Sequence, residues 1–197
     1  MFLKRLRDID VRHALRAVLR RRFSADSVIL EEMVVPGRDS RIDMAVVNGS
    51  LHGFEIKSEV DTLRRLTTQR DSYNCIFDRV TLVVASRHQE KALTVIPSWW
   101  GLGLAAAVRS RVGIKWIRPA LRNPTPDPEM VVRLLRREEV EEAIREANIC
   151  SATDRYYVYE LNRMLVANMT TGELAKTVRL ALKRRHKVSS RQTLGDG

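Results

Sequence analysis

Hydrophobic positions in the first third of the chain change from helical to strand-like spacing. In residues 8–22, Val11, Leu15 and Leu19 recur at four-residue intervals with arginines on the other face, which predicts an amphipathic helix. Three segments rich in branched residues follow and predict strands, at 28–35, 41–47 and 51–57. The last two flank the turn residues Asn48-Gly49-Ser50, and we expect them to form a hairpin.

The middle of the chain adds a second helix and further strands. Leu63, Leu66 and Tyr73 are among the apolar positions of a helix that we predict over 62–77. The near-continuous apolar run at 79–85 is typical of a buried strand. A short helix at 88–95 and weaker strands at 102–108 and 114–117 complete this region. The order of helix, three strands, helix and strand predicts an α/β class with a mixed sheet.

A proline-rich stretch divides the chain in two. Four prolines fall within residues 119–128, where we predict a linker between a core at 1–123 and a helical region at 124–197. Helical spacing in the second region predicts three helices, at 128–147, 154–167 and 171–185. Thr170 and Glu173 have the spacing of a capping box at the start of the last helix.

The charge of the chain is strongly positive and unevenly distributed. The formal net charge is +11 and the isoelectric point is about 10.3. Basic residues concentrate in 4–22 and 176–191, and an acidic stretch at 138–146 lies between them. This balance favours nucleic acid as a partner, DNA above all, because each neutralised phosphate releases counterions. The alternative is a basic surface that serves only solubility.

Other features of the composition indicate the compartment. No apolar run approaches the roughly 20 residues that a membrane-spanning helix needs, and the charged N-terminus does not predict a secretory signal. Cys75 and Cys150 lie far apart and form no CxxC pair, so we expect reduced thiols. We therefore expect a cytoplasmic protein with no membrane partner.

The predicted hairpin carries three residues with candidate chemistry, Asp43, Glu55 and Lys57. They alternate with hydrophobic positions and should project from the opposite face, because successive side chains of a strand alternate. Pairing through a turn near Gly49 would bring Asp43 close to Glu55 or Lys57. A turn of odd length would put all three on one face, and a two-residue turn would put Asp43 on the other face. The hydrophobic residues that predict the core face are Ile42, Met44, Val46, Phe54 and Ile56.

Two carboxylates beside an ammonium group suit phosphodiester hydrolysis. Carboxylate oxygens bind hard cations such as Mg²⁺ or Mn²⁺, which polarise a phosphate and lower the pKa of a bound water. Lys57 would orient that water or neutralise charge in the transition state. The alternative is a surface aspartate with a cross-strand Glu–Lys pair, because the bare pattern also occurs by chance.

The segments Arg41-Ile42-Asp43 and Gly53-Phe54-Glu55-Ile56-Lys57-Ser58 resemble the PD-(D/E)XK nuclease superfamily. The resemblance implies a restriction-endonuclease-like core of a helix, a three-strand meander, a helix and a strand. It also implies that Asp43 and Glu55 bind metal and that Lys57 assists catalysis. The proline that the family usually has before the aspartate is replaced here by Ile42.

Residues after the hairpin extend this resemblance to roughly 25–137. Gln69 and Tyr73 match the Q-x-x-x-Y motif of the RecB-like branch, which implies that they shape the site from the second helix. Segments such as Asp61–Leu66 and Pro97–Gly101 look like an uncharacterised bacterial and prophage branch. Its two tryptophans, Trp99 and Trp100, would stack on bases or, more simply, pack against the sheet.

Upstream residues offer a third metal ligand. Glu32 is the first candidate and Glu31 the second, and only one of them can face the site because they are neighbours on a strand. His13 on the first helix is the alternative, as in RecB-like enzymes, although a histidine there more often lies at the surface.

The helices at 154–167 and 171–185 predict either a helix-turn-helix or a small helical cap with a solvated basic tail. We expect phosphate contacts from four residues of the last helix, Arg179, Lys183, Arg184 and Arg185. The acidic helix around Glu138 would avoid nucleic acid and pack against basic residues of this chain or of another subunit.

Taken together, these patterns predict a Mg²⁺- or Mn²⁺-dependent nuclease that acts on DNA. One alternative is a nucleic-acid-binding protein that has the fold and lacks turnover. Another is a prophage or defence component that acts on DNA or RNA only with a protein partner. Assembly into a homo-oligomer is compatible with all three.

Overall fold

The computed structural model describes residues 5–37, 40–108 and 111–195, with side chains to residue 188. The chain divides into two compact units, Met1–Pro124 and Thr125–Gly197, which are described separately below. The division falls one residue after the boundary expected from the prolines. Within the described residues, every helix is too short or too polar to cross a lipid bilayer.

The first unit is an α/β structure around one mixed sheet, which confirms the expected class. The sheet order is β1-β2-β3-β4-β5-β6. The first three strands form an antiparallel meander, β4 is parallel to β3, β5 is parallel to β4, and β6 is antiparallel to β5. The elements in chain order are α1 (Asp8–Arg22), β1 (Val28–Val35), β2 (Ser40–Val47), β3 (Leu51–Lys57), α2 (Leu66–Asn74), β4 (Arg79–Ala85), η1 (Ser86–His88), α3 (Gln89–Val95), β5 (Gly101–Val108) and β6 (Arg111–Arg118).

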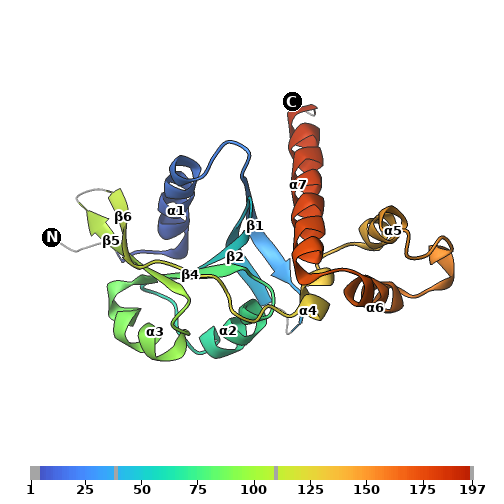
Figure 1. Cartoon of the computed structure of the whole chain (residues 1–197). Helices are drawn as coiled ribbons and strands as arrows, with labels where there is room; N and C mark the ends of the chain where they lie inside the picture. Colours follow the sequence, from blue (N-terminus) through green and yellow to red (C-terminus); the bar gives the residue numbers. More distant parts are fainter. Residues whose placement is uncertain (1–4, 38–39, 109–110, 196–197) are drawn as a thin grey trace. The chain divides into compact units, whose positions relative to one another are not determined.

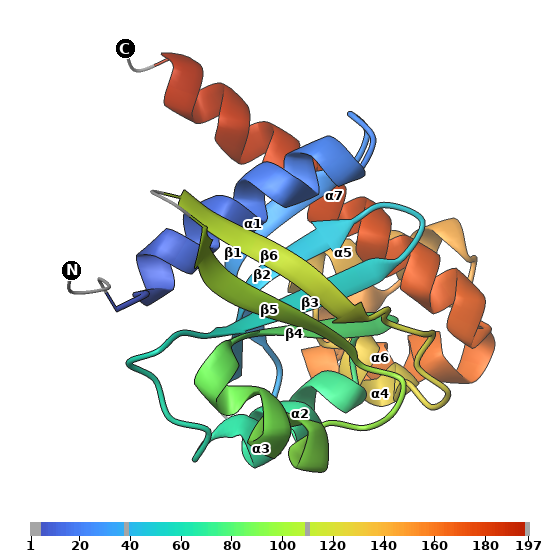
Figure 2. The same cartoon turned by 90° about the vertical axis from the view of Figure 1, so that its left-hand side faces the viewer.

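Helices cover both faces of this sheet, with α1 on one side and α2 and α3 on the other (Figure 1, Figure 2). The α1 side confirms the predicted helical stripe and most of the predicted core face. Its buried residues include Val11, Leu15, Leu19, Met44, Val46, Phe54, Ile56 and Val83. The α2 side is buried as well, with Tyr73, Phe77 and Trp100 at 0% exposure. Glu55 therefore projects into a second packed layer, where Gln69 and Tyr73 of α2 contact it, whereas the Asp43 carboxylate contacts Arg12 of α1.

Ile42 departs from the expected alternation. Its Cδ1 lies 2.9 Å from the position that a Cβ on Gly53 would take, beside the ring of Phe77. Ile42 therefore packs on the α2 side, and the expectation that it shares the α1 face was wrong. Ile42 lies where β2 has separated from β3, and next to Glu32 of β1, which has a φ of 52° and is missing from the β1–β2 pairing.

Trp100 anchors α2 to the sheet, as the packing interpretation predicts. Its indole Nε1 donates a hydrogen bond to Asn74 Oδ1 at 2.8 Å, and its ring stacks on Tyr73 with centroids 6.2 Å apart. Helix α2 begins later than predicted, at Leu66. The preceding residues form a turn instead, in which the Asp61 carboxylate accepts hydrogen bonds from the backbone N–H and the hydroxyl of Ser58.

His52 is held neutral on the α1 side of the sheet. Its Nε2 lies 2.9 Å from the Thr81 hydroxyl oxygen, and its ring stacks on Phe54 with centroids 4.2 Å apart. Burial, followed by the positive charges of Arg79 and Arg22, lowers the pKa of His52 from 6.5 to about 3.

This lowered pKa predicts a loss of stability in acid that depends on His52. Between about pH 3 and pH 6.5, His52 binds a proton more readily in the unfolded chain than in the folded one. The contribution of neutral His52 to the free energy of unfolding is therefore complete above about pH 6.5 and is lost as the pH falls toward 3. From about pH 6.5 to 4.5, urea unfolding should show wild type losing about 2 kcal/mol more than His52→Gln. Both proteins contain the same carboxylates, so His52 alone accounts for any difference in their pH dependence. If the free energy of unfolding falls equally with pH in both, the prediction is contradicted.

The second unit is helical and contains α4 (Pro128–Val132), α5 (Arg137–Glu146), η2 (Thr153–Arg155), α6 (Val158–Asn168) and α7 (Thr171–Gly195). Two predicted boundaries were wrong here, because 128–147 is split into α4 and α5, and the next helix begins at Val158. The last helix also continues past Arg185.

Glutamates in the first turns explain where these helices begin. Each accepts a hydrogen bond from the backbone N–H three residues earlier, which satisfies a free donor at the helix start. The predicted pair of Thr170 and Glu173 is confirmed, with 2.8 Å between the N–H and Oε2. The two pairs that the sequence reading missed are Arg136 with Glu139 at 2.7 Å and Tyr157 with Glu160 at 2.8 Å.

Candidate active site

The hairpin turn sets the register that the candidate site requires. Asn48 Oδ1 accepts a hydrogen bond from the Ser50 N–H at 2.8 Å, and the three-residue turn pairs Val47 with Leu51. The last pair of this register is Met44 with Phe54, so Asp43 and Glu55 are the next residues along the two strands. The turn has the odd length that was predicted to bring both carboxylates together.

Where β2 and β3 separate, the Asp43 carboxylate replaces a backbone carbonyl as the hydrogen-bond acceptor for β3. The last pair of the β2–β3 ladder is Met44 with Phe54. Beyond it, Asp43 Oδ2 accepts a hydrogen bond from the Ile56 N–H at 2.6 Å. Because a side chain replaces the backbone partner, Asp43 is fixed at the point where β2 leaves β3.

Glu55 lies at the centre of the cluster and is 2% exposed. Its Oε1 accepts hydrogen bonds from Lys57 Nζ and Gln69 Nε2, both at 2.6 Å. The Tyr73 hydroxyl lies 2.8 Å from Glu55 Oε2 and 2.8 Å from the Arg41 carbonyl oxygen. The structure thus brings the strand residues and both residues of the Q-x-x-x-Y motif onto one carboxylate.

Burial and charge shift the titration of two of these groups. Burial and the negative charge of Glu55 raise the pKa of Asp43 to about 7, although the Ile56 N–H and Arg12 act in the opposite direction. Burial and the same glutamate also raise the pKa of Tyr73, so its hydroxyl remains protonated and can donate. Burial of the Asp43 carboxyl is the larger cause of its raised pKa, and repulsion by the Glu55 carboxylate adds to it.

Arg12 is a member of the cluster that sequence reasoning missed. Its Nη2 lies 2.8 Å from Asp43 Oδ1, its Nη1 lies 2.5 Å from Glu32 Oε1, and its Nε lies 3.1 Å from Asp8 Oδ2. Its Nη1 also lies 3.2 Å from the Asp43 carbonyl oxygen. The only signal in the sequence was the i,i+4 pair of Asp8 and Arg12 on one helix face.

The upstream metal-ligand candidates do not join this cluster as ligands. Glu32 stands opposite Asp43 on β1, but its oxygens pair with Arg12 and Arg41, and its side chain is 40% exposed. Glu31 pairs with Arg16, and His13 is exposed. Among the described residues, no group of three or more His, Cys, Asp and Glu side chains could hold a metal ion. Glu32 is thus paired with two arginines, and its role as a third ligand stays a prediction.

The basic residues of α7 pair with α5. Arg185 binds Glu139 through Nε and Nη2 at 2.8 and 2.9 Å and donates to the Leu134 carbonyl oxygen at 2.6 Å. Arg184 Nη1 lies 2.8 Å from Glu142 Oε1. The prediction that the acidic helix packs against basic residues of this chain is confirmed. Arg184 and Arg185 are paired with these glutamates, and their predicted contacts with phosphate stay a prediction.

Comparison with known proteins places the chain among phage proteins. Residues 4–196 match the family model described as "Bacteriophage P4 protein cII". The chain is 26% identical over 190 residues to "Protein cII" of Enterobacteria phage P4, which covers 96% of this chain and 71% of that protein. No solved structure matches the chain. Since the family model spans nearly the whole sequence, the chain belongs to the bacteriophage P4 protein cII family.

Proposed function

We propose that this chain is a metal-dependent nuclease that hydrolyses phosphodiester bonds in DNA. The observation that carries the proposal is the bonded cluster around Glu55. In it Asp43 is bound to the strand of Glu55 through the Ile56 N–H, and Lys57, Gln69 and Tyr73 all contact the Glu55 carboxylate. These are the residue types, in the order along the chain, that the resemblance to PD-(D/E)XK nucleases implies.

The order of elements supports the same proposal. Helix α1, the meander β1–β3, helix α2 and the parallel strand β4 follow one another as expected for a restriction-endonuclease-like core. The proposed site lies where β2 separates from β3, beside α2. Within the α/β class with a mixed sheet, we therefore propose a restriction-endonuclease-like core.

The donor set suits a hard divalent cation, Mg²⁺ or Mn²⁺, held by the carboxylates of Asp43 and Glu55. Burial and, after it, repulsion by Glu55 raise the pKa of Asp43, and a bound cation would relieve that repulsion. When bound there, such a cation polarises the scissile phosphate and lowers the pKa of a water molecule.

Three further side chains would act around the carboxylates of Asp43 and Glu55, one by neutralising phosphate charge and two by fixing a carboxylate. Lys57 Nζ lies 2.6 Å from Glu55 Oε1, and its side chain is 12% exposed, so its charge can stabilise negative charge that develops at a bound phosphate. Gln69 and Tyr73 fix the Glu55 carboxylate from α2. Tyr73 stays a donor because its pKa is raised.

A second candidate function is nucleic-acid binding without turnover. Each carboxylate oxygen of Asp43 and Glu55 already accepts a hydrogen bond from the protein, and two of the donors, Arg12 and Lys57, are cationic. In that reading the cluster is a structural charge network that stabilises the hairpin against α1 and α2.

A cleavage assay separates the two candidates. Full-length protein should cut plasmid or linear DNA with Mn²⁺ or Mg²⁺ and not with EDTA. Asp43→Asn should lower the rate at least about 100-fold, because the amide keeps the Ile56 contact but loses the charge that binds metal. Asp26→Asn, at an exposed aspartate of the same unit, is the matched control and should cut like wild type.

Single-stranded DNA and RNA belong in the same experiment. If wild type binds these substrates but cuts none of them with either metal, the nuclease proposal fails and the binding protein is favoured. Equal cleavage by Asp43→Asn and wild type would also contradict the proposal, since it would place the activity elsewhere or in a contaminant.

A further inference from the structure

A second site lies on the α1 side of the sheet, across β3 from the Glu55 cluster. It is a pocket of about 330 Å³, lined by the end of α1, by β3 and β4, and by β6 with the residues that follow it. His52 and Phe54 of β3 line it, and Glu55 projects from the other face of the same strand. The volume falls at the lower end of the range for small-molecule sites and leaves room for one small ligand.

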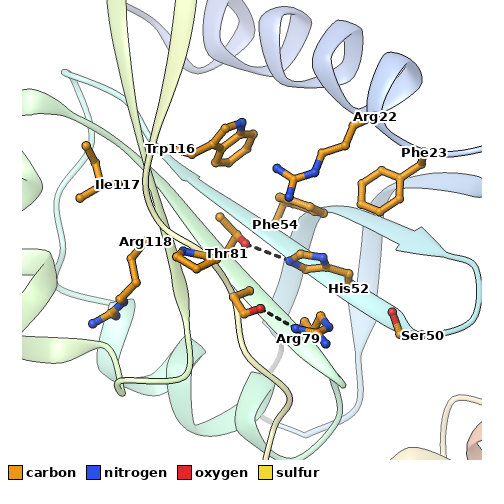
Figure 3. A pocket seen from close by; sticks show the side chains of 12 residues that line it. Arg22, Phe23, Ser50, His52, Phe54, Arg79, Thr81, Trp116, Ile117 and Arg118 are labelled. Carbon is orange, nitrogen blue, oxygen red and sulfur yellow. Dashed lines mark hydrogen bonds between the residues drawn. The ribbon is translucent and has the colours of Figure 1, made fainter.

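Aromatic side chains form one side of the pocket. Figure 3 shows Trp116 and Phe23 there, with the guanidinium group of Arg22 between them. Trp116 is fixed against β5, because a Cβ on Gly103 would lie only 3.0 Å from its ring. Only glycine at that position lets the indole lie so close to the strand. A flat ring that enters the pocket would meet Trp116 as a stacking partner.

The lining of the pocket is positively charged. Arg22 is exposed, and its Cζ lies 5.4 Å from the centroid of the Trp116 ring. Arg79 is fixed in the wall, where its Nη1 donates to the Ala120 carbonyl oxygen at 2.5 Å. Arg118 is turned away, toward the carbonyl oxygens of Trp100 and Pro97. No acidic residue is among the described residues that line the pocket, so its field favours an anion.

Arg22 is the residue best placed to bind that anion. Among the described residues it has no hydrogen bond or ion pair, so its donors remain available to a ligand, whereas Arg79 already uses one on the chain. Opposite the aromatic side, His52 and Thr81 hydrogen-bond to each other and present polar atoms. The pocket thus combines a stacking surface, polar groups and a guanidinium at its rim.

We propose that this pocket binds a single nucleotide, with the base against Trp116 and the phosphate on Arg22. A base supplies the flat ring and the hydrogen-bonding edge, and a phosphate matches the guanidinium fork. The nucleotide is either free or an unpaired residue of a nucleic acid, since both present the same base and phosphate. The inference does not depend on the Glu55 cluster or on nuclease activity.

Titration calorimetry in EDTA tests the proposal on the full chain without cleavage. Probes are the four common nucleoside 5′-monophosphates, the matching nucleosides, benzoate and a short single-stranded oligodeoxynucleotide. We expect at least one monophosphate to bind at least about tenfold more tightly than its nucleoside and than benzoate. Arg22→Ala should weaken that binding about tenfold. The matched control, Arg20→Ala on the same helix and also exposed, should change it less than twofold.

The outcomes distinguish the two sources of the nucleotide. Binding of monophosphates that Arg22→Ala weakens indicates a free nucleotide. Binding of the oligonucleotide alone, with the same dependence on Arg22, indicates an unpaired residue of a nucleic acid. The proposal is overturned if neither binds at millimolar concentration, if benzoate binds as tightly, or if Arg20→Ala weakens binding as much as Arg22→Ala.

Discussion

Replacing Lys57 by methionine should lower the rate of metal-dependent DNA cleavage about 100- to 1,000-fold. The reason is that methionine keeps the length of the side chain and removes the charge that neutralises the developing phosphate oxyanion. Rates are measured at saturating DNA, so the loss should appear in kcat with little change in KM. Lys91→Met, at an exposed lysine of α3, is the matched control and should cut at the wild-type rate.

A structural role for Lys57 would give a different pattern. Its ammonium group is the cation bonded to the buried Glu55, so Lys57→Met should also lower the free energy of unfolding. Lys57→Arg keeps the charge and should recover stability more fully than activity, because a guanidinium group places its donors differently. If the stability loss fully accounts for the loss of activity, or if Lys57→Met cuts at the wild-type rate, a catalytic role for Lys57 is contradicted.

The hairpin shows how much of such a site a sequence can predict. Strand alternation and the polar turn at Asn48–Ser50 predict that Asp43 and Glu55 come together only if the turn has an odd number of residues. The structure meets that condition with a three-residue turn. Local information sufficed here because turn length and side-chain alternation determine the register of a two-stranded hairpin.

Features that depend on distant segments could not be predicted in the same way. Ile42 packs on the other face beside an irregularity in β1, which hydrophobic alternation within β2 does not reveal. Likewise, the charges of α5 and α7 were evident, but the pairing of Arg185 with Glu139 depends on how the helices pack. Arg12 reaches Asp43 only because α1 docks on the sheet.

Arg12→Ala should strongly destabilise the protein. The guanidinium group joins α1, β1 and β2, and its side chain is 11% exposed. Removal leaves Asp43, which is 17% exposed, without its cationic partner. Loss of one partner of a buried ion pair typically costs about 3–5 kcal/mol, and we expect about 3 kcal/mol because Asp8 and Glu32 are partly solvated.

The adjacent turn of α1 provides a matched control. Arg16 pairs with Glu31, and both side chains are about one third exposed. Arg16→Ala should therefore cost less than about 1 kcal/mol. Urea unfolding in EDTA measures both variants without metal. If Arg12→Ala and Arg16→Ala lower the free energy of unfolding equally, the contacts of Arg12 with Asp43 do not stabilise the fold.

Added Mn²⁺ should then stabilise Arg12→Ala more than it stabilises wild type. Arg12 occupies Asp43 Oδ1, an oxygen that the proposed metal site needs, so the arginine and the cation compete for one carboxylate. Removal of the arginine should tighten Mn²⁺ binding about tenfold, which adds about 1.4 kcal/mol to the metal-dependent stabilisation at saturation. Thermal unfolding with and without Mn²⁺ measures this gain. If Mn²⁺ stabilises both proteins equally, Arg12 does not compete with the metal ion for Asp43. If Mn²⁺ stabilises neither protein, metal binding by Asp43 is contradicted. A larger gain in the variant would identify Arg12 as the internal cation that balances the two carboxylates until a metal ion binds.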